Sequence, residues 1–195
     1  MATPDESAVR RLVKEAVERA LGPEPGARSS ASAPVPVPAA APRVVSPRRV
    51  AIGADHGGFP LKETLKRAIA EEMGWEVFDC GTHSSDAVDY PDFAAAVARE
   101  VASGRAARGI VVDGAGIGST MAANKIAGVR CALCHDDRTV LNGREHNDAN
   151  VLALGASVVH RGAAVRLVRL FLTTEFAGGR HERRVRKIMA LEGGR

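Results

Sequence analysis

A carboxylate followed by alternating glycines is the part of this sequence best suited to chemistry. An apolar run over residues 110–112 ends at Asp113, and Gly114, Gly116 and Gly118 follow it. Glycines let the backbone approach a ligand closely and turn its N–H groups toward an anion. A helix that begins near Gly118 would add the positive end of its dipole at the same place. The pattern predicts a potential base beside an anion-binding loop.

The residues around this loop argue against two common nucleotide-binding motifs. Ser119 stands where a dinucleotide fingerprint has its third glycine, and no acidic residue lies about twenty positions further on. The loop also lacks the lysine of a P-loop. A second anion signal lies near the C-terminus, where Arg180 and Arg184 are four residues apart and, on a helix, would share one face. They form either a phosphate clamp or a solvated basic helix, and the glycine loop favours a ligand the size of a sugar phosphate.

Three other clusters of titratable residues lie next to predicted strands. Asp55–Gly58 follow the first strand, Cys134–Asp136 follow the fourth, and Glu145–Asp148 precede the fifth. Ligands bind beyond the carboxyl ends of the strands in open α/β sheets. We therefore expect these clusters to gather with Asp113 near one edge of the sheet, although a lone histidine in such a fold is more often structural.

Strands and helices alternate along the chain. The predicted strands are Arg49–Ala54, Trp75–Cys80, Gly109–Asp113, Val129–Cys134 and Asn150–Leu154. The predicted helices are Pro60–Met73, Phe93–Ser103, Ile117–Lys125, Asp137–Glu145, Ala163–Thr174 and Glu182–Leu191. This alternation predicts a parallel sheet with right-handed crossovers. The expected class is α/β, a Rossmann-like three-layer α/β/α sandwich with a five-stranded parallel sheet, over residues 49–195.

Composition narrows the class of protein. The 195 residues are 45% hydrophobic and 26% charged, which is typical of a soluble globular protein. There is neither an apolar run of about 18 residues nor a secretory signal, so we expect no membrane partner. The net charge is +4, but arginines are spread along the chain and aromatic residues make up 4%, which argues against nucleic-acid binding.

The cysteines indicate a reducing compartment and a cytoplasmic location. There are three of them, an odd number that does not make a disulfide framework. Cys131 and Cys134 resemble a redox or zinc motif, but residues i and i+3 of a strand point to opposite faces. We therefore predict no metal site, and interpret all three cysteines as small buried hydrophobic residues.

An amphipathic helix is predicted at residues 1–21. Thr3 is a candidate N-cap, Pro4 suits the first helical position, and apolar residues recur with helical spacing. Residues 22–48 are rich in Pro and Ala and predict an extended linker. The helix would self-associate, dock on its own domain, enter a groove of another protein, or lie on a membrane surface. It resembles the encapsulation peptides of bacterial microcompartments, which implies a shell protein or other cargo as partner and a place inside such a compartment.

The segments of the main domain, taken together, resemble the ribose-5-phosphate isomerase B and galactose-6-phosphate isomerase family. The motifs that carry the resemblance are Gly53–Phe59, Asp89–Pro91, Gly114–Gly118, Ala122–Lys125, Glu145–Asn150 and Gly178–His181. The resemblance covers about residues 50–188. It implies a homodimer or dimer of dimers with active sites between subunits. It also implies aldose–ketose isomerisation without a metal or organic cofactor.

The resemblance further implies roles for individual residues. A base moves a proton between C2 and C1 through an enediolate, and N–H groups of the glycine loop stabilise the oxyanion. His146 would assist opening of the furanose ring. Arg180 and Arg184 would hold the phosphate, and Tyr90 would line the pocket. The residues expected to bind substrate are Asp55, His56, Tyr90, Gly114, Ala115, Gly116, Ile117, Gly118, Ser119, Asn147, Arg180 and Arg184.

The chain departs from the family at the glycine loop itself. Many members have a cysteine base where this chain has Asp113, and a threonine where it has Ala115; others use a glutamate where it has Ser119. We therefore expect Asp113 to be the base, as carboxylates are in other isomerases. Three alternatives stay open: a catalytically silent binding subunit, a hetero-oligomer whose partner supplies the base, and an isomerase of a six-carbon or deoxy-sugar phosphate.

Overall fold

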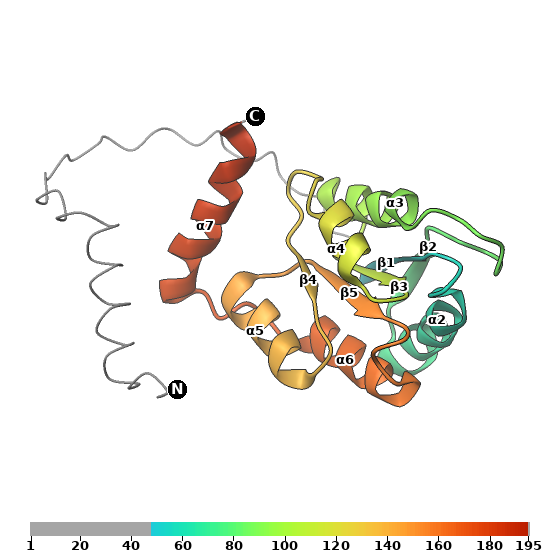
Figure 1. Ribbon diagram of the computed structural model, residues 1–195. Coiled ribbons are helices and arrows are strands. Elements are labelled where there is room, and N and C mark those ends of the chain that lie inside the picture. The colour runs from blue at the N-terminus through green and yellow to red at the C-terminus, as the bar shows by residue number, and fades with distance from the viewer. Residues whose placement is uncertain (1–47, 195) are drawn as a thin grey trace, which may run out of the picture. The chain divides into compact units, whose positions relative to one another are not determined.

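A parallel five-stranded sheet forms the centre of the fold in the computed structural model, which describes residues 48–194 (Figure 1). The strands are β1 (Arg49–Ala54), β2 (Glu76–Asp79), β3 (Arg108–Asp113), β4 (Cys131–Leu133) and β5 (Val151–Gly155). Their order in the sheet is β2-β1-β3-β5-β4, and every pairing is parallel. The predicted sheet is confirmed. The predicted N-terminal helix, and the linker up to residue 47, lie outside the described residues.

Helices cover both faces of this sheet. The helices of the described residues are α2 (Phe59–Met73), α3 (Tyr90–Ala102), α4 (Ile117–Ala123), α5 (Asp137–Asn147), α6 (Arg161–Thr173) and α7 (Glu182–Ala190), with 3-10 turns η1 (Gly179–His181) and η2 (Leu191–Gly194). Helices α3 and α4 pack together on one face, and α6 packs between α2 and α5 on the other. The three-layer sandwich is therefore confirmed. No helix among residues 48–194 is long and apolar enough to cross a membrane.

Two apolar cores lie on the two faces of the sheet, because alternate strand residues point to opposite sides. Ile52 belongs to the core under α2 and α6, whereas Ala51 belongs to the core under α3 and α4. Cys134 and Cys131 follow the same division, which confirms that they face apart. Burial raises the pKa of Cys131 to about 12 and that of Cys134 to about 11. The interpretation of all three cysteines as buried is wrong for Cys80, which is only half-buried at the end of β2.

The helices that follow β1 and β3 pack on opposite faces of the sheet. The chain leaves β1 for α2 on one face, and leaves β3 for α4 on the other. In open α/β sheets, ligands bind beyond the carboxyl ends of the strands at such a switch point. Asp113 is the last residue of β3, so the fold places it at this switch point.

A buried lysine ties the end of β2 to α2. Lys62 is fully buried, and its Nζ donates hydrogen bonds to Oδ1 and Oδ2 of Asp79 at 2.8 and 2.7 Å and to Oε1 of Glu63 at 2.9 Å. Lys66 Nζ lies 2.6 Å from Asp79 Oδ2. Burial raises the pKa of Asp79, but the hydrogen bonds from Lys62, Lys66 and the Gly81 N–H outweigh burial and hold this pKa below its usual range.

We predict that Asp79→Asn destabilises the fold, because it leaves the buried Lys62 ammonium with Glu63 as its remaining carboxylate partner. Breaking a buried ion pair by removing one partner typically lowers the free energy of unfolding by roughly 3 kcal/mol or more. Because the pKa of Asp79 is lower in the folded than in the unfolded chain, this stabilisation is complete at pH 7. It is lost as the pH falls below about 4 and through the folded-state pKa.

Urea unfolding at a series of pH values measures the difference in the free energy of unfolding between wild type and Asp79→Asn. This difference should become smaller at acidic pH. Glu76→Gln is the matched control. It removes the ion pair between the exposed Glu76 and the partly buried Arg49, and should change the free energy of unfolding by no more than about 1 kcal/mol. An unchanged urea midpoint for Asp79→Asn at pH 7 would contradict the role given to Lys62.

Candidate active site

The glycine loop after β3 folds around the side chain of Asp113. This carboxylate is 5% exposed, and its Oδ1 accepts hydrogen bonds from the N–H groups of Ala115, at 2.9 Å, and of Gly116. Its Oδ2 accepts the N–H of Ser119, in the first turn of α4, at 3.0 Å. Three N–H groups of the predicted anion-binding loop therefore bind an anion, and that anion is a side chain of the same chain.

The backbone around this carboxylate leaves little space for larger residues. Gly116 has φ of 80° and caps α4, and a Cβ there would lie 2.4 Å from Leu133 Cδ1. From the other side, a Cβ on Gly155 would lie 2.6 Å from the carbonyl oxygen of Ala115. Ser157 donates hydrogen bonds to the Gly114 carbonyl oxygen through its N–H, at 3.0 Å, and through its Oγ. The loop after β5 thus supports the glycine loop.

Sequence reasoning had missed this contribution of the loop after β5. The Gly155-Ala156-Ser157 sequence directly after a predicted strand was the available signal, because small residues there allow two loops to approach each other.

Three further predicted site residues lie at the same edge of the sheet. Asp55 Oδ1 accepts the N–H of Gly58 at 2.8 Å, which shapes the turn into α2. The Nδ1 atom of His56 lies 3.2 Å from the N–H of Val88, in the loop before α3. The Tyr90 ring packs on Gly118, where a Cβ would lie 2.5 Å from its Cζ. We call Asp55, His56, Tyr90, Asp113 and residues 114–119 the carboxyl-edge group.

The remaining predicted site residues form a separate cluster around two stacked imidazoles. The rings of His146 and His181 are 4.2 Å apart between centroids, with 5° between their planes. Arg180 Nε lies 3.3 Å from His181 Nε2. The pKa of His181 lies below its usual range, because of burial first and then the nearby His146, Arg180 and Arg184. We call Asn142, His146, Asn147, Arg180, His181 and Arg184 the amino-edge group.

A buried arginine fixes the end of α5, which carries His146. Arg144 is 1% exposed, and its Nη1 donates hydrogen bonds to Asp148 Oδ1 at 3.0 Å and to the carbonyl oxygen of Ala149. Its Nε donates to the carbonyl oxygen of Thr174 at 3.0 Å. Arg144 was not singled out from the sequence, because arginine is rarely buried and no spacing rule marks it.

Within one chain, the carboxyl-edge group lies at the carboxyl ends of the strands and the amino-edge group at their amino ends. Helix α5 begins after β4 and returns the chain to the start of β5 (Figure 1). Its last turn, which includes His146, therefore lies toward the amino ends of the strands. Asp113 lies at the carboxyl end of β3, a six-residue strand that spans about 16 Å. The expectation that all the clusters gather at one edge is therefore wrong for residues 145–148, since that cluster precedes a strand rather than following one.

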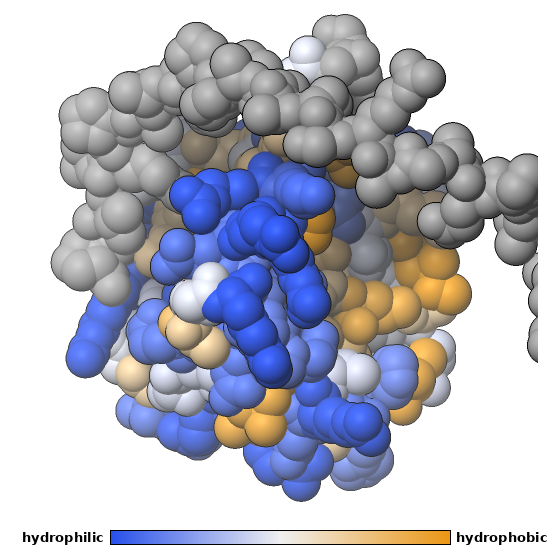
Figure 2. Space-filling model, turned by 90° about the vertical axis from the view of Figure 1, so that its left-hand side faces the viewer, coloured by the Kyte–Doolittle hydropathy of each residue, from blue (hydrophilic) through white to orange (hydrophobic). Residues whose placement is uncertain are grey.

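Arg180 and Arg184 are also arranged differently from a pair on one helix. Arg180 lies in η1, whereas Arg184 lies in α7, and a helix boundary separates them. Both charges nevertheless act on His181 between them. Figure 2 looks onto the side of the molecule where α7 lies, and hydrophilic side chains project over much of this surface. Arg180 and Arg184 are both exposed, so their guanidinium groups are accessible to an anion.

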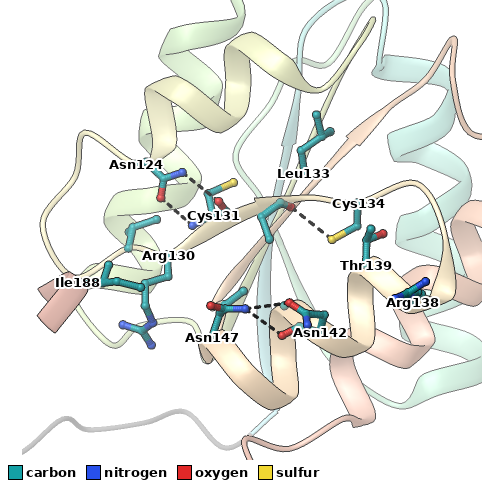
Figure 3. Close-up of a pocket in the computed structure, with 14 residues that line it drawn as sticks. Asn124, Arg130, Cys131, Leu133, Cys134, Arg138, Thr139, Asn142, Asn147 and Ile188 are labelled. Carbon is teal, nitrogen blue, oxygen red and sulfur yellow. Dashed lines mark hydrogen bonds between the residues drawn. The ribbon is translucent and has the colours of Figure 1, made fainter. Parts of the chain in front are cut away.

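A cavity of about 540 Å³ adjoins the amino-edge group beside the edge strand β4 (Figure 3). Asn142 and Asn147 of α5 line it, together with Asn124 at the end of α4 and Ile188 of α7. Asn124 pairs with the edge strand itself: its Oδ1 accepts the N–H of Cys131 at 2.8 Å, and its Nδ2 donates to the Cys131 carbonyl oxygen at 2.9 Å. Within residues 48–194, no cluster of three or more His, Cys, Asp or Glu side chains is placed to hold a metal ion.

We predict that Gly116→Ala destabilises the protein, because the substitution combines a left-handed backbone with a clash against Leu133. The expected loss is about 2 kcal/mol or more in the free energy of unfolding. Gly114→Ala is the control in the same loop, since a Cβ there meets nothing within 4 Å, and it should stay within about 0.5 kcal/mol of wild type. Equal melting temperatures for the two variants would contradict this account of the loop.

Comparison with known proteins places this architecture in a family. A family model described as ribose/galactose isomerase matches residues 50–188. Ribose-5-phosphate isomerase B of Escherichia coli is 43% identical over 145 residues, which cover 74% of this chain and 97% of that protein. The structure of ribose-5-phosphate isomerase B from Clostridium thermocellum has a TM-score of 0.73 at 46% identity, over 75% of this chain and 98% of that one. The enzyme from Mycoplasma genitalium with bound ribulose-5-phosphate has a TM-score of 0.72 at 37% identity, over 75% and 97% of the two chains. The chain belongs to the ribose/galactose isomerase family.

Proposed function

We propose that this chain interconverts ribose 5-phosphate and ribulose 5-phosphate, with Asp113 as the base. The chain is an aldose–ketose isomerase of sugar phosphates, as its family and its relatives named ribose-5-phosphate isomerase B indicate. The relative described with bound ribulose-5-phosphate supports the choice of a five-carbon substrate.

The assignment of Asp113 rests on the number of hydrogen bonds that each of its two carboxylate oxygens accepts. Each carboxylate oxygen can accept at two lone pairs. Oδ1 already accepts from Ala115 and Gly116, whereas within residues 48–194 Oδ2 accepts only from Ser119. Oδ2 therefore retains the free position. The three N–H donors hold the carboxylate in one orientation.

The chemistry follows from this position at the carboxyl end of β3. Asp113 Oδ2 takes the proton from C2 of the open-chain aldose, giving an enediolate, and returns a proton to C1. The N–H groups of Gly114, Ile117 and Gly118 make no hydrogen bond within residues 48–194. These N–H groups would bind the oxyanion at O1 and O2, while those of Ala115, Gly116 and Ser119 hold the base.

A second copy of the chain would supply the rest of the site. His146, Asn147, Arg180 and Arg184 are separated from Asp113 of the same chain by the length of the sheet. A homodimer, alone or as half of a dimer of dimers, would bring the amino-edge group of one copy to the carboxyl-edge group of the other. The arginines would then hold the phosphate and position the reacting carbons, and His146 would assist ring opening.

We predict that Asp113→Asn and Asp113→Ala lose turnover of ribose 5-phosphate by at least about 100-fold, which is the contribution expected of a general base. Asp113→Cys should retain measurable turnover, because a thiolate at this position can also accept the proton. Turnover is measured by the appearance of ribulose 5-phosphate, with a six-carbon aldose phosphate assayed in parallel. Asp137→Asn, at an exposed ion pair with Arg166, is the control and should behave as wild type. Full activity in Asp113→Ala would exclude this carboxylate as the base.

We also predict that two inactive variants restore activity when their subunits are mixed. A dimer of one Asp113→Asn chain and one His146→Ala chain contains one intact site, made of Asp113 from the second chain and His146 from the first. Random mixing of equal amounts should give about a quarter of the wild-type activity, because half the dimers are mixed and each has one of two sites intact. Co-refolded samples test this, and absence of any recovery in mixed dimers would place both residues of a site in one chain.

A further inference from the structure

A residue that the sequence did not reveal contacts the imidazole of His146. Asn142 precedes His146 by one helical turn on α5, so the two side chains share a face. The amide nitrogen Nδ2 of Asn142 lies 2.9 Å from Nδ1 of His146. Asn147, at the end of the same helix, contacts Asn142 in turn, as Figure 3 shows.

The direction of each hydrogen bond in this group follows from one backbone carbonyl. The carbonyl oxygen of Asn142 can only accept, so the atom of Asn147 that lies 3.1 Å from it must be the amide nitrogen Nδ2. The same Nδ2 donates to Oδ1 of Asn142 at 3.0 Å. The other end of the Asn142 amide, which faces His146, is therefore the NH₂ group, and it donates to His146 Nδ1.

This chain of donors determines where the histidine carries its proton. A ring nitrogen that accepts a hydrogen bond has no proton of its own, so the proton of neutral His146 is on Nε2. We propose that Asn142 is a positioning residue that holds His146 as the neutral Nε2–H tautomer, with Nε2–H directed to the sugar as a hydrogen-bond donor. The inference rests on the proposed function, in which His146 assists ring opening.

Aromatic and cationic groups lie around His146, and no carboxylate is hydrogen-bonded to its ring among residues 48–194. His181 stacks on it at 4.2 Å, and the guanidinium groups of Arg180 and Arg184 lie close enough to His181 to act on its charge. A neutral imidazole can still polarise an oxygen through its N–H group, as neutral histidine does in triosephosphate isomerase.

The proposed role of Nε2–H is to stabilise the ring oxygen as its bond to C1 breaks. This oxygen gains electron density while the C1 carbonyl forms, and a hydrogen-bond donor aimed at it lowers the barrier. An aldotetrose 4-phosphate cannot close a furanose ring, because its O4 carries the phosphate. Its isomerisation needs the base but not the ring-opening donor, so the two substrates separate the two functions.

The test combines nitrogen NMR with kinetics on the full-length protein. Long-range ¹H–¹⁵N spectra of protein labelled in its six histidines report which ring nitrogen is protonated, and the signal of His146 is assigned by its loss in His146→Gln. In wild type, Nδ1 should be unprotonated and Nε2 protonated. In Asn142→Asp, the carboxylate accepts instead of donating, so the proton should move to Nδ1. Asp137→Asn changes one charge at the start of the same helix and should leave the pattern as in wild type.

The kinetic measurement uses the same variants. Asn142→Asp and Asn142→Leu should lower turnover of ribose 5-phosphate about tenfold or more relative to turnover of the aldotetrose 4-phosphate, the scale of one lost polarising interaction. A His146 ring protonated on Nδ1 in wild type would overturn the proposal, and so would equal losses on both substrates. The NMR pattern is measured whether or not the enzyme turns over ribose 5-phosphate, so failure of the proposed function is distinguishable from failure of this inference.

Discussion

The carboxylate of Asp113, bound by the N–H groups of its own loop, is the interaction on which the rest of the site depends. It joins the end of β3 to the first turn of α4, and so fixes the path of every residue between them. It also acts as the negative group at the positive end of α4. This arrangement requires the left-handed backbone of Gly116 and the close approach of Gly155 to the loop. A carboxylate held by three N–H groups has little freedom to move, which suits the proposed role of Asp113 as a base.

The sheet explains why the site is divided. In a parallel sheet every helix returns the chain to the opposite edge, so residues that follow a strand and residues that precede one lie apart. Asp55 and Asp113 follow strands, whereas His146 and Asn147 precede β5. In the function proposed above, proton transfer and phosphate binding belong to opposite ends of the strands. The proposed dimer would reconcile this division with a single reaction, because each site would take one group from each copy.

Much of the fold was predictable because the strands are short apolar runs between helices with clear periodicity. β1 matches its predicted bounds, and α3 begins three residues earlier than predicted because Asp89 and Pro91 suit a helix start. β4 is shorter than its predicted six residues, since it lies at the edge and pairs with one strand only. Asn142 was not predictable, because its role depends on the direction of three amide hydrogen bonds that no spacing rule encodes.

The pairing of Asn124 with β4 has a consequence for how copies of this chain can associate. An exposed edge strand is normally a place where a strand of another molecule can add to the sheet. Here the side-chain amide already occupies the N–H and the carbonyl oxygen of Cys131. A second copy would have to displace that amide before any continuous sheet could form. Any association at the β4 edge strand would therefore use side chains and helices, and the Asn124 amide opposes open-ended addition of strands to the sheet.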